Sequence, residues 1–357
     1  MENKRTPLYE EHVKLGAKMF PFAGWEVPLQ YSSVKEEHLA VRHNVGIFDV
    51  SHMGQVFVSG NDALSYLQNL VPQDISKLVE NKASYSMLVN EDGGIIDDLI
   101  IYRLKGRYLL IVNASRIQED LSRLISMKNS YDVVIDNRSE ELAMIAVQGP
   151  KASDLVEAIG ISKTDHPERF SIKELNSVLI ARTGYTGEDG FEIIVENKDA
   201  VDLWKKLVAH GAVPVGFAAR DTLRLEASYL LYGQDMDEQT TPIEASLCWA
   251  IPRDKQADYA GKAIILNQMQ TKNVKKKLVR FKMLDKSIPR HDYRIYIENQ
   301  DMGKVTSGGF SPCTNTGIGL GFIDSKEPFA EGTKIDIMIR GKLHPAEIIG
   351  KPVYNRK

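Results

Sequence analysis

Six short strand-like segments near the end of the chain constrain the fold more than any other feature. They are residues 279–283, 293–297, 303–307, 317–323, 334–339 and 344–349, with Gly, Pro and Asn turns between them. Short strands at such spacing are typical of a small β-barrel or sandwich. A polar, basic stretch at 270–277 precedes them and is typical of a solvated linker. The sequence therefore predicts a C-terminal β-domain over residues 273–357.

The preceding 272 residues mix helical and strand-like stretches without a regular repeat, which predicts an α+β fold rather than a βαβ array. Ser33 and Glu36 form a capping-box pattern that opens a helix to about His43. Further helices are expected at 63–70, 115–127 and 200–210, and the longest between Gly216 and Gly233.

A three-stranded meander is predicted at residues 84–89, 95–104 and 107–112. Turn chemistry at 90–94 and at 105–106 separates these strand-like runs. A buried strand is expected at 142–147, and another at 191–196 after the glycine-rich turn 184–190. An antiparallel meander of this kind can present one functional face.

Charge and cysteine usage exclude several classes of protein. Lys and Arg number 45 against 48 Asp and Glu, a net charge of −3, so no basic footprint for nucleic acid or anionic membranes is present. No apolar run approaches the roughly 20 residues of a membrane-spanning helix, and the N-terminus lacks a secretory pattern. Two cysteines, Cys248 and Cys313, are too few for a disulfide framework or an all-cysteine metal site. These features predict a cytoplasmic protein.

Common catalytic motifs are also absent. The sequence has no phosphate loop, no His-Glu-x-x-His zinc helix and no Gly-x-Ser-x-Gly nucleophile elbow. The glycine-rich run 317–321 lies in the β-rich tail without a following helix, so a bulged strand is favoured there over a dinucleotide site.

The meander carries the first candidate residues. Side chains alternate along a strand, so Asp98 and Tyr102 share one face of 95–104 and Asp97 begins the other. A carboxylate leading into an apolar face is suited to act as a general base or to orient a ligand. The alternative is that one Asp is exposed at the hairpin end and the other caps a turn. Tyr85, on the partner strand, could form an aromatic wall beside such a site.

Glu192 and Tyr185 are the second candidates, in and after the glycine-rich turn. If Glu192 points into a pocket, its two oxygens can accept two parallel N–H bonds from a cyclic amidine. The alternative is an edge-strand Glu that faces water.

Two further patterns have structural alternatives. Arg220 and Arg224 are four residues apart, so they share a helix face that suits a carboxylate or carbonyl ligand. They could instead pair with Asp221, Glu226 or a surface acid. His52 could titrate near neutrality, although a structural hydrogen-bonded histidine is favoured.

Seven strings in register along nearly the whole chain resemble the aminomethyltransferase (T-protein) family of the glycine cleavage system. They are FAGWEVP at 22–28, FDVSHMG at 48–54, GGIIDDL at 93–99, RTGYTGEDGFE at 182–192, LRLE at 223–226, YGQDMDE at 232–238 and VTSGGFSP at 305–312. The resemblance implies a three-domain, cloverleaf-like arrangement around a central folate channel. Residues 1–272 would form two intertwined α+β domains, and 273–357 would form a small β-barrel.

The resemblance also implies the reaction. A lipoylated H-protein presents an aminomethyl group on sulfur, and the one-carbon unit passes to tetrahydrofolate as co-substrate. The products are 5,10-methylenetetrahydrofolate, ammonia and the dihydrolipoyl H-protein. No metal is implied, and neither nucleic acid nor a membrane is an expected partner.

Residues are carried over only where they match the family motifs. Asp98 matches the catalytic Asp, with a carboxylate expected near folate N5 and N10; it could orient the cofactor, handle a proton or stabilise an iminium-like cation. The other matches are implied to bind folate or substrate. They are Tyr85, Tyr102, Tyr185, Glu192, Arg224 and, with a looser alignment, Tyr354.

Small departures and two competing families complete the comparison. Arg116 stands where the family often has Asn, and Ser246 and Cys248 stand where it usually has Gly. These changes affect the expected specificity for the polyglutamate tail or the lipoyl arm rather than the catalytic group.

One alternative function is a folate-binding accessory protein of iron–sulfur cluster assembly, but residues 231–235 lack the cysteine of those relatives. The other is the folate domain of a sarcosine- or dimethylglycine-oxidising flavoenzyme, which carries a flavin domain ahead of this segment.

Overall fold

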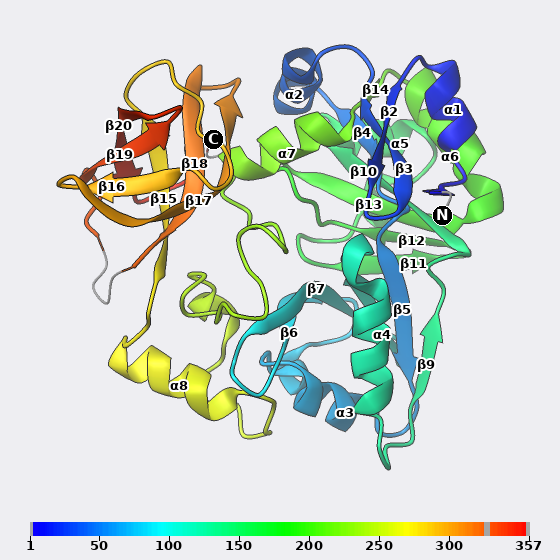
Figure 1. The fold of residues 1–357 in the computed structure, drawn as a ribbon. Helices are drawn as coiled ribbons and strands as arrows, with labels where there is room; N and C mark the ends of the chain where they lie inside the picture. Colours follow the sequence, from blue (N-terminus) through cyan, green and yellow to red (C-terminus); the bar gives the residue numbers. More distant parts are fainter. Residues whose placement is uncertain (1–2, 325–328, 355–357) are drawn as a thin grey trace. The chain divides into compact units, whose positions relative to one another are not determined.

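The structure is a computed structural model and describes residues 3–324 and 329–354. The chain divides into two compact units, each assembled from two separate stretches of sequence (Figure 1). The first comprises Met1–Ser86 and Asp97–Asp221, and the second comprises Met87–Ile96 and Thr222–Lys357. The predicted boundary near residue 273 falls inside the second unit and stays a prediction.

A six-stranded sheet forms the core of the first unit, in the order β11-β12-β13-β10-β4-β14. Its neighbouring strands are antiparallel, except that β14 runs parallel to β4. Helices α5 (Ala152–Ala158) and α6 (Asn197–Ala209) pack on it through residues such as Leu155 and Trp204. All of β10 is buried, as its uninterrupted apolar sequence predicts. The strands are β4 (Gly46–Asp49), β10 (Leu142–Gln148), β11 (Ile172–Leu175), β12 (Val178–Ala181), β13 (Gly190–Glu196) and β14 (Val213–Pro214).

The predicted meander is confirmed as part of a five-stranded sheet, in the order β6-β7-β8-β5-β9. Strands β7 and β8 are antiparallel, and Leu99 lies opposite Val112. Figure 1 shows α4 beside β5 and β9, and α4 packs against β9. The elements are β5 (Gly54–Ser59), β6 (Ala83–Val89), β7 (Ile95–Leu104), β8 (Arg107–Val112), β9 (Val134–Asn137), α3 (Ala63–Leu70) and α4 (Ile117–Ser126).

The N-terminal segment forms a three-stranded sheet in the order β1-β3-β2, together with two helices. Helix α2 begins at the predicted cap, because the Ser33 hydroxyl accepts a hydrogen bond from the Glu36 N–H at 3.2 Å. The elements are β1 (Lys4–Arg5), β2 (Lys18–Phe22), β3 (Trp25–Gln30), α1 (Tyr9–Lys14) and α2 (Val34–His43). Short 3-10 turns are η1 (Ile75–Lys77), η2 (Ala114–Arg116), η3 (Lys163–Asp165) and η4 (Cys248–Ala250).

The helix expected between Gly216 and Gly233 is shorter than predicted. Helix α7 covers only Phe217–Glu226 and ends in a Schellman motif. Ser228 takes the left-handed conformation with φ 58°, its N–H donates to Leu225 O at 3.0 Å, and the Tyr229 N–H donates to Arg224 O at 2.8 Å. The prediction was wrong because serine gives no glycine-like stop signal at this position.

The second unit contains the predicted β-barrel, which is closed in the order β15-β18-β17-β16-β19-β20. Its core includes Phe281, Ile295, Val305 and Ile337, all fully buried. The glycine-rich run 317–321 is indeed a strand, and the bulge lies opposite it, between Val305 and Ser307. The elements are α8 (Lys262–Thr271), β15 (Lys277–Met283), β16 (Arg294–Ile297), β17 (Gln300–Ser311), β18 (Thr316–Ile323), β19 (Lys334–Ile339) and β20 (Lys342–Ile349). The expected α+β fold with a C-terminal barrel is thus confirmed.

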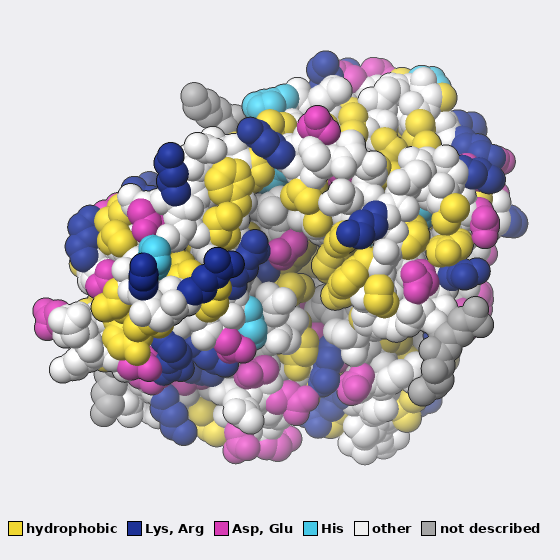
Figure 2. Space-filling model, turned by 45° about the horizontal axis from the view of Figure 1, so that its top comes forward, with side chains coloured by type: hydrophobic (Ala, Val, Ile, Leu, Met, Phe, Trp, Pro, Cys, Tyr) yellow, Lys and Arg dark blue, Asp and Glu magenta, His cyan; other side chains and the backbone are white. Residues whose placement is uncertain are grey.

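The distribution of charged side chains on the surface agrees with the near-neutral net charge of the sequence. Figure 2 shows Lys and Arg side chains interspersed with Asp and Glu over the face in view. Within the described residues, no helix combines the length and the apolar character needed to cross a membrane.

Candidate active site

The two consecutive carboxylates of β7 are held from the end of the neighbouring strand. Asn113, which directly follows β8, donates from Nδ2 to Asp97 Oδ1 and to Asp98 Oδ1, both at 2.8 Å. Its backbone N–H donates to Asp97 Oδ2 at 3.1 Å. Asp97 is fully buried and Asp98 is half-buried, so neither carboxylate is exposed at the hairpin end. One amide therefore fixes both side chains.

The surroundings of Asp98 adjust its acidity. Burial raises the pKa of the Asp98 carboxyl to about 7, and the negative charge of Asp97 adds to this. Hydrogen bonds from Asn113 and from the Tyr85 side chain oppose the rise by stabilising the carboxylate. A carboxyl that titrates near neutrality can both take up and release a proton under physiological conditions.

Tyr85 of β6 contacts Asp98 directly. Its side chain is hydrogen-bonded to the Asp98 carboxyl, and burial together with the charge of Asp98 raises the pKa of the phenol well above its usual value. Tyr85 therefore remains protonated and donates to the carboxylate. The predicted pairing of an aromatic wall with the acid of β7 is consistent with this contact.

A second acidic group is fixed on β13. Glu192 is 8 % exposed and lies opposite Ala146 of β10 and Ala181 of β12, so it occupies a central strand rather than a sheet edge. The Thr183 hydroxyl donates to Glu192 Oε2 at 2.5 Å, and the Tyr102 hydroxyl lies 2.7 Å from Thr183 Oγ1. Burial raises the pKa of Glu192, while Thr183, Arg220 and Tyr102 stabilise its charged form.

The glycine-rich turn that supports Glu192 depends on close packing at Gly184. A Cβ atom there would collide with the side-chain amide of Gln148. That amide donates to Thr183 O at 3.0 Å and accepts from the Thr186 hydroxyl at 2.8 Å. The absence of a side chain at Gly184 thus lets the Gln148 amide form hydrogen bonds with Thr183 and Thr186, on either side of this glycine.

Arg220 is a site residue that the motif comparison did not select. Its guanidinium lies 4.9 Å from the centroid of the Tyr185 ring and interacts electrostatically with Glu192. Burial lowers the pKa of Arg220, as expected for a cation among partly apolar neighbours. Asn113 and Thr183 were missed for a different reason, because their roles depend on strand pairing that no local pattern states.

Arg224 and Tyr354 belong to the second unit. Arg224 is almost fully buried and donates to Asp235 Oδ2 at 2.9 Å, Ser307 Oγ at 2.9 Å and Tyr229 O at 3.2 Å. The Tyr354 N–H donates to Glu226 O at 3.3 Å. The two arginines of α7 thus have different surroundings, and Arg224 forms an ion pair with Asp235.

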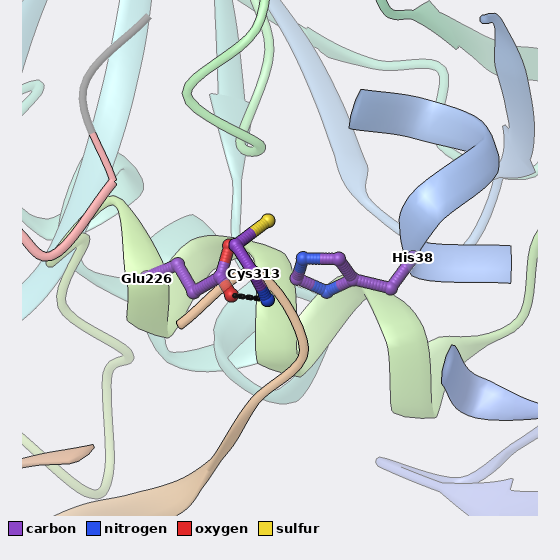
Figure 3. Close-up of side chains that lie close together, drawn as sticks. All are labelled: His38, Glu226 and Cys313. Atoms are coloured by element: carbon purple, nitrogen blue, oxygen red, sulfur yellow. Dashed lines mark hydrogen bonds between the residues drawn. The ribbon is translucent and has the colours of Figure 1, made fainter. Parts of the chain in front are cut away.

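A buried polar network connects three of the sequence strings within the second unit. Asp235 accepts from Arg224 and from the Thr306 and Ser307 hydroxyls, at 2.5 and 2.8 Å for the hydroxyls. Glu226 accepts from the Ser311 hydroxyl at 2.5 Å and from the Cys313 N–H at 3.1 Å (Figure 3). The strings at 223–226, 232–238 and 305–312 therefore have a structural role here.

His52 has the environment of a structural residue. It is 3 % exposed, and burial lowers its pKa to about 4, so the ring is neutral. Phe22 packs edge-on against it at 6.0 Å, and its Nδ1 has no hydrogen-bond partner among the described residues. A neutral histidine of this kind is unsuited to proton transfer near neutral pH.

Comparison with known proteins gives matches along nearly the whole chain. Residues 8–255 match the family model described as the GCVT N-terminal domain, and residues 276–355 match the glycine cleavage T-protein C-terminal barrel domain. An aminomethyltransferase of Thermosipho melanesiensis is 44 % identical over 357 residues, which covers 98 % of this chain and 97 % of that protein. An aminomethyltransferase of Bacillus subtilis is 44 % identical over 363 residues and covers 99 % of each chain.

A solved structure shares the fold over nearly the full length. The crystal structure of glycine cleavage system aminomethyltransferase T from Bartonella henselae superposes with a TM-score of 0.94 at 34 % identity. The match covers 99 % of both chains.

Proposed function

Because this chain belongs to the glycine cleavage T-protein family of aminomethyltransferases, we propose that it transfers the one-carbon unit of an S-aminomethyl-dihydrolipoyl H-protein to tetrahydrofolate. The products are 5,10-methylenetetrahydrofolate, ammonia and the dihydrolipoyl H-protein. The observation that carries this proposal is the Asp98 carboxyl, fixed by Asn113 and Tyr85 and titrating near neutral pH. Tetrahydrofolate is the co-substrate and the H-protein the protein partner, in the cytoplasm.

Asp98 is the catalytic group of this proposal. Each of the two folate nitrogens that come to share the methylene carbon exchanges an N–H bond for an N–C bond. Of the two protons released, one ends on the departing ammonia and the other on the lipoyl sulfur, whose bond to the carbon breaks. A carboxyl with a pKa near 7 suits this exchange because neither protonation state is strongly disfavoured at neutral pH. In its ionised form the same carboxylate stabilises a cationic iminium-like intermediate by charge.

Glu192 is the proposed acceptor for the amidine-like edge of the pterin. Thr183 bonds one carboxylate oxygen, Oε2, and so fixes the orientation of the group. The carboxylate retains acceptor capacity for parallel N–H bonds from a ligand. Tyr102 supports Thr183, and Tyr185 offers an aromatic face beside Arg220 for stacking.

Arg224 and Tyr354 complete the proposed set of folate contacts. For Arg224 the proposal rests on the family resemblance; its guanidinium donates to Asp235, Ser307 and the Tyr229 carbonyl. For Tyr354, the proposal rests on the family resemblance, and its backbone is anchored to Glu226.

The proposal is tested by incubating the full-length chain with aminomethyl-loaded H-protein, with and without tetrahydrofolate. We expect ammonia and 5,10-methylenetetrahydrofolate to form together in the presence of the folate, and ammonia release to fall sharply without it. Lipoylated H-protein without the aminomethyl group is the control and should give neither product. Ammonia release at the same rate with and without folate would contradict the proposal.

A further inference from the structure

A third buried carboxyl lies behind the catalytic pair and has no place in the transfer chemistry. Asp120, on α4, is fully buried, as is Asp97 on β7. The carboxyl groups of these two residues lie within hydrogen-bonding reach of each other. Two acidic groups thus meet in the interior of the first unit, one on a helix and one on a strand.

This contact requires a proton. A carboxylate has only acceptor oxygens, so two ionised carboxylates cannot form a hydrogen bond. Asp97 has both oxygens engaged by donors of Asn113. Among the described residues, no side-chain or backbone donor satisfies either oxygen of Asp120. The remaining way to satisfy the pair is a carboxylic acid at Asp120 that donates to a carboxylate at Asp97.

The other charged groups around the pair agree with this distribution. The positive charge of Arg116 stabilises an ionised Asp120, but the negative charges of Asp97 and Glu119 oppose ionisation. The negative charge of Asp97 also acts on the Asp98 carboxyl, to which Tyr85 is hydrogen-bonded. The pair therefore places one net negative charge next to the catalytic carboxyl.

We propose that Asp120 is a positioning residue that stays protonated in the folded protein and donates a hydrogen bond to Asp97. Asp97, together with Asn113, holds the Asp98 carboxyl in place. This inference deepens the proposed function and rests on it for the role of Asp98. Burial, followed by the charge of Asp97, raises the pKa of Asp120 to about 10, which is consistent with a proton retained at neutral pH.

Replacement of Asp120 by asparagine and replacement by leucine should therefore have different effects on the charge of Asp97. Asparagine keeps a donor toward Asp97 in the form of its amide N–H, so Asp97 stays ionised. Leucine removes the donor. Without this hydrogen bond, the buried Asp97 carboxylate takes up a proton more readily. Loss of the charge on Asp97 then removes a repulsion from Asp98, and the pKa of Asp98 falls.

Infrared difference spectroscopy on the ligand-free, full-length chain tests the proton itself. At about pH 8.5 Asp98 is mostly ionised, and the wild type should still show a protonated carboxyl band that shifts in heavy water. Asp120→Asn should lack this band, and Glu119→Gln, an exposed acid one residue away, should retain it. A wild type without the band, or Asp120→Asn with it, would overturn the proposal. This infrared experiment does not depend on the transfer activity.

Kinetic profiles against pH then test the link to Asp98. Asp120→Asn should retain more than about half of the wild-type rate, with the same pH midpoint, whereas Asp120→Leu should move the midpoint at least about half a pH unit lower. A purely structural role predicts a lower rate with an unmoved midpoint in Asp120→Leu, and that result would refute the link. If the wild type proves inactive, the proposed function fails while the infrared result stands.

Discussion

Asp98 illustrates how position decides the chemistry of a residue. Asp97 is its neighbour in sequence, yet the alternation of β7 and the different depth of the two side chains make Asp97 a buried anchor and Asp98 the accessible acid. Replacing Asp98 by Asn should lower the rate of methylene transfer by about 100-fold or more, because an amide cannot exchange a proton. Folate affinity, measured by calorimetry, should change by less than about threefold because the shape of the side chain is kept.

The exposed acid Asp92, in the hairpin turn before β7, provides the control. Asp92→Asn makes the same chemical change without touching the carboxyl pair and should retain the wild-type rate. Near-normal turnover of Asp98→Asn would remove the catalytic assignment.

The pH dependence of the transfer should report the same group. Burial raises the pKa of Asp98 to about 7, so if the ionised form is the active one, the rate rises as the pH increases through about 7 and falls in acid. Stopped-time assays of methylenetetrahydrofolate between about pH 5.5 and 9 would locate the midpoint. A midpoint near 4, the value of an ordinary exposed Asp, would show that another group controls the rate.

Glu192 gives a prediction about binding rather than turnover. Glu192→Ala removes an acceptor for two charge-assisted hydrogen bonds, each worth roughly 1.5–3 kcal/mol, so tetrahydrofolate affinity should fall at least about tenfold. Calorimetric titration measures this, and the exposed Glu80→Ala is the matched control. An affinity of Glu192→Ala equal to that of the control would exclude the proposed contact with the pterin edge.

Only part of the candidate site could be predicted from the residues themselves. Alternation along 95–104 singled out Asp98 and Tyr102, because a period of two is a local property of strands. Asn113 and Thr183 could not be found in this way, since each gains its role from a residue 15 or 9 positions away through pairing and turn geometry. Asp120 was missed for the same reason, because its contact joins a helix to a strand.

At the scale of elements, local signals predicted both limits of some segments and missed a limit of others. The strands at 95–104 and 107–112 and the helix at 63–70 have the predicted limits, because strong turn or breaker residues flank them. Helix α7 stops early, because Ser228 adopts a conformation that the sequence does not announce. The two hydrogen bonds of the Schellman motif offset the cost of that conformation.

The end of α7 yields a prediction about stability. A left-handed conformation costs a residue with a Cβ roughly 1 kcal/mol more than glycine, so Ser228→Gly should raise the free energy of unfolding by up to about 1 kcal/mol. Thermal unfolding should then shift upward by about 2 °C. Ser122→Gly, in the exposed interior of α4, is the control and should lower stability by a similar amount. Equal shifts of the same sign in both variants would contradict this account.

At the scale of the whole molecule, the barrel shows what sequence patterning can and cannot provide. All six barrel strands were predicted from short apolar runs and turns, but not their order, in which β15 lies between β18 and β20. Closure depends on contacts between residues more than 60 positions apart, such as Phe281 opposite Ile348. Such pairing is set by the packing of the barrel interior, which no local window contains.

The stability of the first unit should depend on pH through the proton held by Asp120. The pKa of this residue rises from 3.8 to about 10 on folding, so between these values the folded state binds one proton more than the unfolded state. Its contribution to stability is therefore greatest in acid and declines as the pH rises, by at most about 1.4 kcal/mol per pH unit. Asp120→Asn carries no such proton, so its free energy of unfolding relative to the wild type should increase steadily from about pH 5 to 9. Denaturant titrations at several pH values measure this difference, with Glu119→Gln as the control. A difference that stays constant with pH would mean that Asp120 ionises alike in both states, and that the Asp97 contact lacks its proton.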